Sequence, residues 1–507
     1  MALEPLRVVV YAPRAMNYAK LKFKRGDARA IYSQLVEALE SAIEREDLTA
    51  GVRLPSERAL AVQLKLSRTT VVNAYRELEA RGLLRSHVGR GTFVCARPEP
   101  ADAPFAWRGK VSAFAQQSAD PSLRNLHLDT MNSRLISFAA GIPAIECFPL
   151  ADYRRLMERV LKDESDTVLG LGPTEGQAPL RKAIAARIRT RAERVLILSG
   201  SQQGLDLIAR CLIDAGDTVV LDRPGYVGAV QTFRAAGAKL VGWDTVRADL
   251  DELEDLILRY RPKLLYTNPT FQNPTGKVFS LRERRDLLRL AVRYRIPVIE
   301  DDPYRDAYLD ATPAPPSLYE LDEHNIVIHH STFSKVLAPG LRLGWLAASE
   351  YVVDQLALIK QRENLFTEGL SQLVVAEFLQ SGLFDDHLDK LRREHARRRD
   401  RMSDALERHL PAKLLTYARP KGGLYFWCRL GHGLKGRQLL QRAMAEGVVF
   451  ANGEIFYADE AGAHELRLCF ASQTVDKIEE GIKRLAASLK SQNEIHAPHE
   501  ASLMPIV

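Results

Sequence analysis

Five short apolar runs between residues 194 and 331 constrain the fold of this 507-residue chain more than any other feature. Each run has the length of a β-strand and helical patterns lie between them, which predicts an α/β domain. Each run also ends in small, polar or acidic residues, and ligand groups are expected beyond the carboxyl ends of strands in an open sheet. The runs cover residues 194–200, 217–223, 263–269, 296–302 and 325–331.

Two segments at these strand ends are suited to an aldehyde cofactor that carries a phosphate. In STFSKVLAPGLRLGW (331–345), Lys335 lies among small residues and Arg342 follows seven positions later. A lysine amine forms an internal aldimine, and an arginine can bind a phosphate. In SGSQQGLD (199–206), the backbone amides of Ser201 and Gln202 would begin a helix, where phosphates bind. Together the segments predict a pyridoxal-phosphate (PLP) site.

Three further turns carry groups suited to the PLP ring. Tyr226 follows the second run and could stack on the ring. Asn273, in NPTFQNPTG, could bind the phenolic oxygen, and Asp301, with Tyr304 three residues on, could keep the pyridine nitrogen protonated. Taken singly, a turn asparagine, a solvated aspartate or a surface lysine is the more common explanation. Their occurrence in this order favours a cofactor site.

Residues 31–94 predict a second, smaller domain. Apolar residues recur at helical spacing from Ile31 to Ile43, and two short helices follow, with Ser56 and Ser67 as expected N-caps. In the second of these short helices, the residues expected to face the core are Val71, Val72, Tyr75 and Leu78. Two short helices joined by a tight turn are typical of a helix-turn-helix. The segment LLRSHVGRGTFV then predicts a two-stranded wing. By periodicity alone, a small helical domain with no DNA-binding role is an equal alternative.

The exposed start of the third helix would face a DNA major groove. Arg68 can form two hydrogen bonds with guanine, while Thr69 and Thr70 are suited to contacts with phosphates or with thymine methyl groups. Arg90, beside Gly91 at the tip of the wing, could enter a minor groove. The charge distribution favours double-stranded DNA as a partner, because residues 1–97 hold 17 basic and 10 acidic side chains while the other 410 residues hold 54 of each.

Composition restricts the class of protein further. No run of 18 apolar residues occurs, which predicts no membrane span, and the N-terminus lacks the features of a signal peptide. The five scattered cysteines fit reduced thiols in a cytoplasmic protein, and no histidine has metal-ligand spacing. We expect an N-terminal extension, a DNA-binding domain, a linker, a PLP domain and a disordered tail, at residues 1–25, 26–97, 98–134, 135–490 and 491–507.

The segment LPSERALAVQLKLSRTTVVNAYRELEARGLLRSHVGRGTFV (54–94) resembles the GntR family of bacterial winged-helix repressors. This resemblance implies a mainly α winged helix-turn-helix with a β-wing. It also implies a DNA-contact set of Arg58, Ser67, Arg68, Thr69, Thr70, Arg90 and Gly91.

Residues 135–490 resemble fold-type I, class I and II aminotransferases, especially the branch that acts on aromatic, branched-chain and aminoadipate substrates. The resemblance implies a large domain with a mixed, mostly parallel sheet and a smaller C-terminal α/β domain. Lys335 would be the Schiff-base lysine, and Arg467, in HELRLCFA, would pair with a substrate carboxylate. The other implied cofactor contacts are Ser201, Gln202, Tyr226, Asn273, Asp301, Tyr304, Thr332, Ser334 and Arg342.

One position departs from the aminotransferase pattern. In LGLGPTEGQAPLRKAIA (169–185), Leu171 stands where the family usually has a tyrosine that reaches the phosphate of the neighbouring subunit. The change predicts a weaker hold on the cofactor or impaired turnover.

The order of the two domains resembles the MocR subfamily of transcriptional regulators. The resemblance implies a homodimer that binds an operator and senses an amino compound, or PLP itself, through aldimine chemistry at Lys335. Such a regulator would be cytoplasmic and associated with the nucleoid when bound to DNA. Two alternatives stay open: an active aminotransferase that carries a DNA-binding domain, and a PLP-binding repressor without an amino effector. Arg467 favours an effector that bears a carboxylate.

Overall fold

The computed structural model describes residues 18, 30–45, 47–87, 91–95, 110–112, 114–115, 118, 134–310, 313–431 and 433–496. The chain divides into two compact units, Met1–Lys110 and Val111–Val507, and each is described by itself. The division falls within the predicted linker, 98–134. No helix in the described part of the chain is long and apolar enough to cross a membrane.

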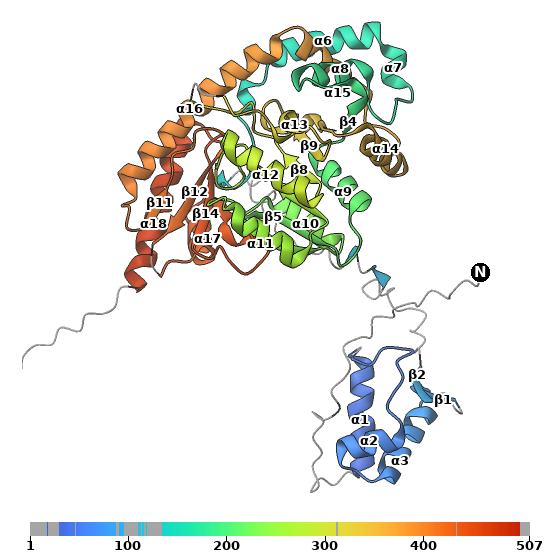
Figure 1. Ribbon diagram of the computed structural model, residues 1–507. Helices are drawn as coiled ribbons and strands as arrows, with labels where there is room; N and C mark the ends of the chain where they lie inside the picture. Colours follow the sequence, from blue (N-terminus) through green and yellow to red (C-terminus); the bar gives the residue numbers. More distant parts are fainter. Residues whose placement is uncertain are drawn as a thin grey trace, which may run out of the picture. The chain divides into compact units, whose positions relative to one another are not determined.

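Among its described residues, the first unit contains three α-helices and one two-stranded sheet (Figure 1), which form the predicted winged helix-turn-helix. The predicted tip residue, Arg90, lies outside the described residues. The five elements are α1 (Ile31–Glu44), α2 (Glu57–Leu64), α3 (Arg68–Ala80), β1 (Leu84–His87) and β2 (Gly91–Val94).

The core of this unit differs from the predicted pattern at one position of α3. Val71, Tyr75 and Leu78 are buried as expected, but Val72 is only half-buried and Ala74 takes its place in the core. The spacing 71, 74, 75, 78 follows one face of a 3.6-residue helix more closely than a pair of adjacent valines does. Small residues such as alanine allow α1 and α3 to pack closely.

The second unit is built on a seven-stranded sheet in the order β4-β10-β9-β8-β7-β5-β6. All five predicted strands are present, and two strands, β6 and β10, were not predicted. Only β10 runs antiparallel to its neighbours, so the sheet is mixed and mostly parallel as expected. The bounds are β4 (Val195–Leu198), β5 (Thr218–Arg223), β6 (Lys239–Asp244), β7 (Leu264–Thr267), β8 (Val298–Asp301), β9 (Val327–Thr332) and β10 (Gly344–Ala347).

Alternate residues of these strands pack on opposite faces of the sheet. Ile299 and Ile328 belong to a core formed with α9, α10 and α14, whereas Val298 and Val327 belong to a core formed with α11, α12 and α13. The helices are α9 (Ser201–Leu212), α10 (Val227–Ala235), α11 (Leu250–Tyr260), α12 (Leu281–Tyr294), α13 (Leu318–Leu321) and α14 (Glu350–Asn364).

A smaller domain has a five-stranded sheet in the order β11-β12-β14-β13-β3. Figure 1 shows α16 running from the large domain, beside α15, to the small domain, beside α18. Helix α18 continues to His496. Residues 491–496 are therefore helical, although they were predicted to belong to a disordered tail. The strands are β3 (Ile136–Phe138), β11 (Leu415–Tyr417), β12 (Tyr425–Leu430), β13 (Val448–Asn452) and β14 (Glu465–Cys469).

The described residues of the second unit also form the following helices. The α-helices are α6 (Leu150–Asp163), α7 (Ser165–Leu169), α8 (Ala178–Arg187), α15 (Gly369–Gln380), α16 (Leu383–His409), α17 (Gly436–Ala445) and α18 (Val475–His496). The short 3-10 helices are η3 (Ile145–Cys147), η4 (Ala192–Arg194), η5 (Phe333–Lys335), η6 (Pro339–Leu341) and η7 (Gly453–Phe456).

Candidate functional site

Lys335 lies in η5, directly after the end of β9. Its Nζ atom donates to the carbonyl oxygen of Gly141 at 2.8 Å. Burial, followed by the nearby positive charge of Arg467, lowers the pKa of this amine from its usual value near 10.5 to about 8. A lysine near pKa 8 is partly neutral at physiological pH, which makes it a usable nucleophile.

Asp301 ends β8 and is held on both carboxylate oxygens. The hydroxyl of Tyr266 donates to Oδ2 at 2.5 Å, and Nδ1 of His330 lies 3.0 Å from Oδ1. Burial raises the pKa of Tyr266 well above its usual value, with the charge of Asp301 adding to the effect, so the phenol stays a donor. These contacts fix the carboxylate at the strand end, where the sequence predicts a partner for a pyridine nitrogen.

A cradle for an anion lies at the start of α9. Gly200, the N-cap, has φ +100°, and no side chain caps the first turn. A Cβ atom at Gly200 would lie 2.3 Å from Nη2 of Arg342, so a larger residue would need both a strained backbone and a shift of this guanidinium. Backbone amides of Ser201 and Gln202 and the charge of Arg342 therefore meet at one place, as the prediction of a phosphate site requires.

Two hydroxyl groups lie just before Lys335. Thr332 donates from Oγ1 to the carbonyl oxygen of Leu343 at 3.0 Å, and its Oγ1 lies 3.0 Å from Oγ of Ser334. Both side chains are buried. They keep the turn between β9 and η5 closed, and they are the two hydroxyls that the sequence predicted beside a phosphate.

The side chain of Gln202 has a role that was not predicted, whereas the predicted phosphate contact is one of its backbone amide. Its Oε1 atom accepts from the hydroxyl of Tyr226 at 3.3 Å, and its Nε2 atom donates to Thr232 at 2.7 Å. Both ends of the amide are thus engaged with α10 and the residue before it, so only the backbone of Gln202 is left for an anion. The side chain instead orients Tyr226, the predicted stacking residue.

Arg467, on β14, is almost fully buried and lies in the same site. Its Nη1 atom donates to Oδ1 of Asn273 at 2.7 Å, and its Nη2 atom donates to the carbonyl oxygen of Ala139. The guanidinium lies 4.0 Å above the ring of Tyr425. Its Nε atom is buried and has no hydrogen-bond partner among the described residues. This arrangement orients a guanidinium cation that can bind a carboxylate by donating hydrogen bonds to it.

Tyr425 and Gly141 were not predicted as part of the site. The hydroxyl groups of Tyr425 and Tyr304 lie 3.1 Å apart, and the two rings meet edge to face. A Cβ atom at Gly141 would lie 1.7 Å from the hydroxyl of Tyr425, so this position requires glycine. The double glycine before Leu424 and Tyr425 was the only sequence signal available for this part of the site.

Leu171, the departure noted in the sequence, is 87% exposed, and Leu169 nearby is 84% exposed. Such exposure leaves neither side chain packed against the cofactor residues of its own chain. An exposed pair of leucines is typical of a surface that another protein covers.

The donor set fits PLP. Lys335 offers an amine of lowered pKa, and Asp301 offers a buried carboxylate. The uncapped start of α9, beside Arg342, offers a place for a phosphate. The uncapped helix start, at a glycine of positive φ beside Arg342, is the feature that a phosphate group explains.

In the first unit, four of the predicted DNA-contact residues lie at or directly before the start of α3: Ser67, Arg68, Thr69 and Thr70. Arg58 lies in α2. The Ser67 hydroxyl accepts from the amide of Thr70 at 3.1 Å, which makes it the predicted N-cap. Arg58, Arg68 and Thr69 are exposed. Arg68 has a single ion pair of 3.3 Å, with Glu57, and its side chain is 71% exposed. Gly91 has φ +106° and begins β2.

Two family models match the chain. Residues 134–485 match "Aminotransferase class I and II", and residues 31–94 match "Bacterial regulatory proteins, gntR family".

Three known proteins illustrate the similarity. A 469-residue match at 32% identity to the uncharacterized HTH-type transcriptional regulator YdfD of Bacillus subtilis covers 90% of this chain and 96% of that protein. The probable rhizopine catabolism regulatory protein MocR of Rhizobium meliloti is 31% identical, over 83% of this chain and 86% of that protein. The crystal structure of LysN, the α-aminoadipate aminotransferase of Thermus thermophilus, complexed with N-(5'-phosphopyridoxyl)-L-leucine, is similar with a TM-score of 0.73 and 37% identity, over 77% of this chain and all of that one.

Proposed function

Because the chain belongs to the class I and II aminotransferase family and carries a GntR-type helix-turn-helix before that domain, we propose that it is a MocR-type transcriptional regulator that uses PLP to sense an amino compound. The observation that carries the proposal is a complete PLP site, with Lys335 at its centre, in a chain that also has a DNA-binding domain. Such a regulator acts at the nucleoid, in the cytoplasm.

The side chains divide the work of holding the cofactor. PLP supplies an aldehyde that reacts with amines and a ring that withdraws electrons. Lys335 would provide the amine that anchors it, Asp301 would accept a hydrogen bond from the ring nitrogen, and Tyr226 would stack on the ring. Asn273 and Tyr304 would contact the ring oxygen. The residues that would bind the phosphate are Ser201, Gln202, Thr332, Ser334 and Arg342.

Arg467 selects the amino compounds that the protein senses. Its unpaired Nε and its Nη atoms can bind a carboxylate with charge-assisted hydrogen bonds. An amine that also carries a carboxylate would therefore be bound at this site more tightly than a simple amine. A PLP-binding repressor without an amino effector would have little use for a carboxylate-binding group at this position.

The signal then passes to the DNA-binding domains. An effector shifts the protein between two arrangements only if it binds them with different affinity. We propose a homodimer, because two helix-turn-helix units can then bind paired half-sites. Arg58, Ser67, Arg68, Thr69, Thr70, Arg90 and Gly91 form the DNA-contact set.

The test is an absorbance titration of the purified, PLP-loaded protein with a panel of amino acids and amines. The Lys335→Ala variant is the blank, since it has no amine to link to the cofactor. A sensor gives a new cofactor band that persists with one compound, and that compound also changes the affinity for operator DNA. No spectral response to any amino compound would contradict the proposal.

A second candidate is an active aminotransferase, because Asp301, Lys335, Arg342 and Arg467 are all present and LysN is 37% identical. The same titration separates the two functions. An enzyme converts the cofactor to its amine form and recovers it when a keto acid is added, cycle after cycle. A regulator does not need to complete that cycle.

A further inference from the structure

Arg467 is held by the last of a chain of buried hydrogen bonds that begins at Asp222. The backbone amide of Asn268, directly after β7, donates to Oδ2 of Asp222 at 2.8 Å. Oδ1 of Asn268 accepts from the backbone amide of Asn273 at 2.9 Å, and Oδ1 of Asn273 accepts from Nη1 of Arg467 at 2.7 Å. All four residues are almost fully buried. A change at Asn268 is therefore passed to Arg467 through Asn273.

The side-chain amide of Asn268 is engaged at both ends. Its Oδ1 atom accepts from Asn273, and its Nδ2 atom donates to the backbone carbonyl oxygen of Asp301. A backbone amide can only donate and a carbonyl oxygen can only accept, so these two partners fix the orientation of the side chain. Asn268 thus connects the turn that carries Asn273 to the strand that ends in Asp301.

The turn between β7 and α12 does not hold its shape through its own backbone preferences. Phe271 has φ +50°, a left-handed conformation that is unfavourable for a bulky residue. Such a conformation persists only where the surrounding contacts enforce it. Gln272 provides a second such contact, because its Nε2 atom donates to Oδ2 of Asp222 at 3.0 Å and to Oγ1 of Thr245 at 2.7 Å. Contacts from outside the turn therefore determine where Asn273 lies.

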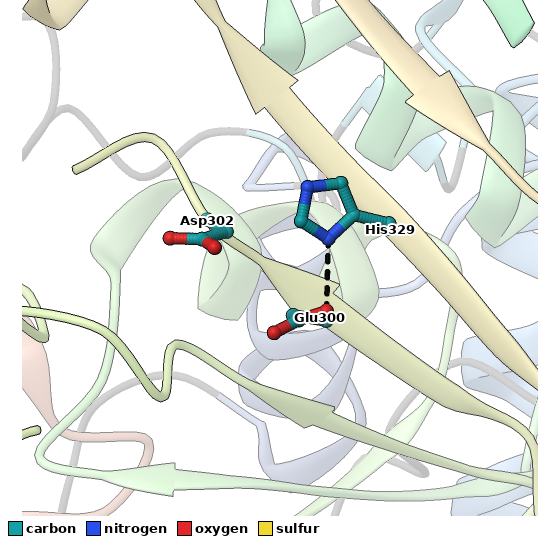
Figure 2. Close-up of side chains that lie close together, drawn as sticks. All are labelled: Glu300, Asp302 and His329. Carbon is teal, nitrogen blue, oxygen red and sulfur yellow. Dashed lines mark hydrogen bonds and ion pairs between the residues drawn. The ribbon is translucent and has the colours of Figure 1, made fainter. Parts of the chain in front are cut away.

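The strand that accepts from Asn268 is itself fixed by contacts on its other face. Figure 2 shows Glu300 of β8 beside His329 of β9, with Oε2 and Nδ1 2.8 Å apart. Glu300 also accepts from the first two backbone amides of α13, at 2.8 and 3.0 Å. Oδ2 of Asp302, the third residue in Figure 2, lies 2.6 Å from Nε of Arg305. The residues on both sides of Asp301 are thus held in place, and Asn268 connects the turn to this fixed position.

We propose that Asn268 is a positioning residue that sets the affinity of Arg467 for the carboxylate of an amino-acid effector. It acts through Asn273, whose Oδ1 atom orients the guanidinium. A group that is already oriented loses less freedom when its ligand binds, so it binds more tightly. The proposal rests on the role proposed above for Arg467, and it adds the residue that prepares this guanidinium for its ligand.

The probe is radiolabelled 4-methylpentanoate, measured by equilibrium dialysis with the full-length, PLP-loaded protein. This compound is leucine without its amine, so its binding reports the carboxylate contact and needs no reaction with the cofactor. We expect the parent protein to bind it and Arg467→Gln to lose the binding. Asn268→Leu removes both side-chain hydrogen bonds with little change of shape, and it weakens binding about tenfold at every pH.

Asn268→Asp separates positioning from packing. An ionised carboxylate at this position still accepts from Asn273 but repels the carbonyl oxygen of Asp301, whereas the hydroxyl of the acid form can donate to that oxygen as the amide does. Burial and the nearby carboxylates of Asp222 and Asp301 favour the acid form. The affinity of Asn268→Asp, relative to the parent at the same pH, therefore recovers as the pH falls from about 9 to about 6, while that of Asn268→Leu does not.

Asn452→Leu is the matched control. Asn452 is also a buried asparagine at the end of a strand, but its Oδ1 atom has no hydrogen-bond partner among the described residues. This variant should bind the probe as the parent does. The proposal is overturned if Asn268→Leu binds like the parent, if Asn452→Leu loses as much affinity, or if Asn268→Asp stays as weak as Asn268→Leu at every pH. A parent protein that does not bind the probe overturns it as well.

The titration with primary amines tests the sensing function separately. A parent protein that binds 4-methylpentanoate through Arg467 but gives no spectral response to any amine would refute sensing. The role of Asn268 would still be decided by the dialysis of its two variants, because the probe has no amine.

Discussion

His330 connects Asp301 to the first turn of α9. Its Nδ1 atom lies 3.0 Å from Oδ1 of Asp301, and its Nε2 atom lies 2.6 Å from the carbonyl oxygen of Ser201. A carbonyl oxygen can only accept, so Nε2 carries a proton. The imidazole therefore donates to the carbonyl oxygen of Ser201, and its other nitrogen faces the carboxylate of Asp301. Asp301 and the first turn of α9 are thereby fixed relative to each other.

We expect His330→Leu to raise the dissociation constant for PLP about tenfold, because Asp301 loses a buried hydrogen-bond partner. Fluorescence titration of the cofactor-free protein with PLP measures the change. His324→Gln is the control, since His324 is exposed. An unchanged dissociation constant in His330→Leu would show that Tyr266 alone holds the carboxylate of Asp301.

The covalent attachment of PLP depends on the protonation of Lys335. The neutral amine attacks the aldehyde, and the pKa of this amine is lowered to about 8. Attachment is therefore slow where the amine is protonated, below about pH 8, and its rate rises as the pH increases through that value. Stopped-flow absorbance of the cofactor-free protein mixed with PLP at a series of pH values measures this midpoint. A midpoint near the ordinary lysine value of about 10.4 would contradict the lowered pKa.

The strands of the large domain could be predicted because apolar runs of strand length end at polar groups. Two strands could not. β6 lies at the sheet edge and is mostly half-buried, so its apolar pattern is weak. β10 has only four residues, and it lies in the segment that was interpreted as the cofactor motif. The half-burial of Val72 shows a similar limit, because adjacent valines do not reveal which of them faces the core.

Most of the predicted cofactor residues lie at the ends of strands, where the short apolar run and the polar residues after it can be recognised in the local sequence. Their partners come from distant segments. Asn273 and Arg467 are 194 residues apart, and Gly141 lies 194 residues before Lys335. His330 was visible as one of an adjacent histidine pair, but its role depends on which face of β9 it occupies. Packing decides such contacts, so spacing within one motif could not supply them.

Gly200→Ala tests the phosphate cradle. The substitution combines a left-handed backbone, φ +100°, with a contact of 2.3 Å to Arg342. Gly216→Ala is a matched control, because Gly216 has φ +97° and no described atom lies within 4 Å of its added Cβ. Both variants lose about 1 kcal/mol of stability from backbone strain. Only Gly200→Ala also loses PLP affinity, by about tenfold or more, in the same fluorescence titration. Equal PLP affinity in the two variants would place the phosphate elsewhere.

Arg68→Ala tests the DNA-contact surface, and Arg45→Ala provides a close control. Each arginine is largely exposed, at 71% and 65%, and each has one ion pair of 3.3 Å with an acidic neighbour. Removing an exposed pair costs the fold little, so both variants should unfold at nearly the same temperature as the parent. Arg68 begins α3, where side chains face the major groove, whereas Arg45 follows the end of α1.

The expected loss for Arg68→Ala is about 1–3 kcal/mol in operator binding, which is about fivefold to 150-fold in the dissociation constant, with relaxed base preference at one position. Fluorescence anisotropy with labelled operator DNA at two salt concentrations measures both effects. Arg45→Ala should bind as the parent does, apart from a small decrease at low salt, because a distant charge acts only through the screened field of the domain. A similar loss in the two variants would mean that Arg68 contributes charge alone and does not contact a base.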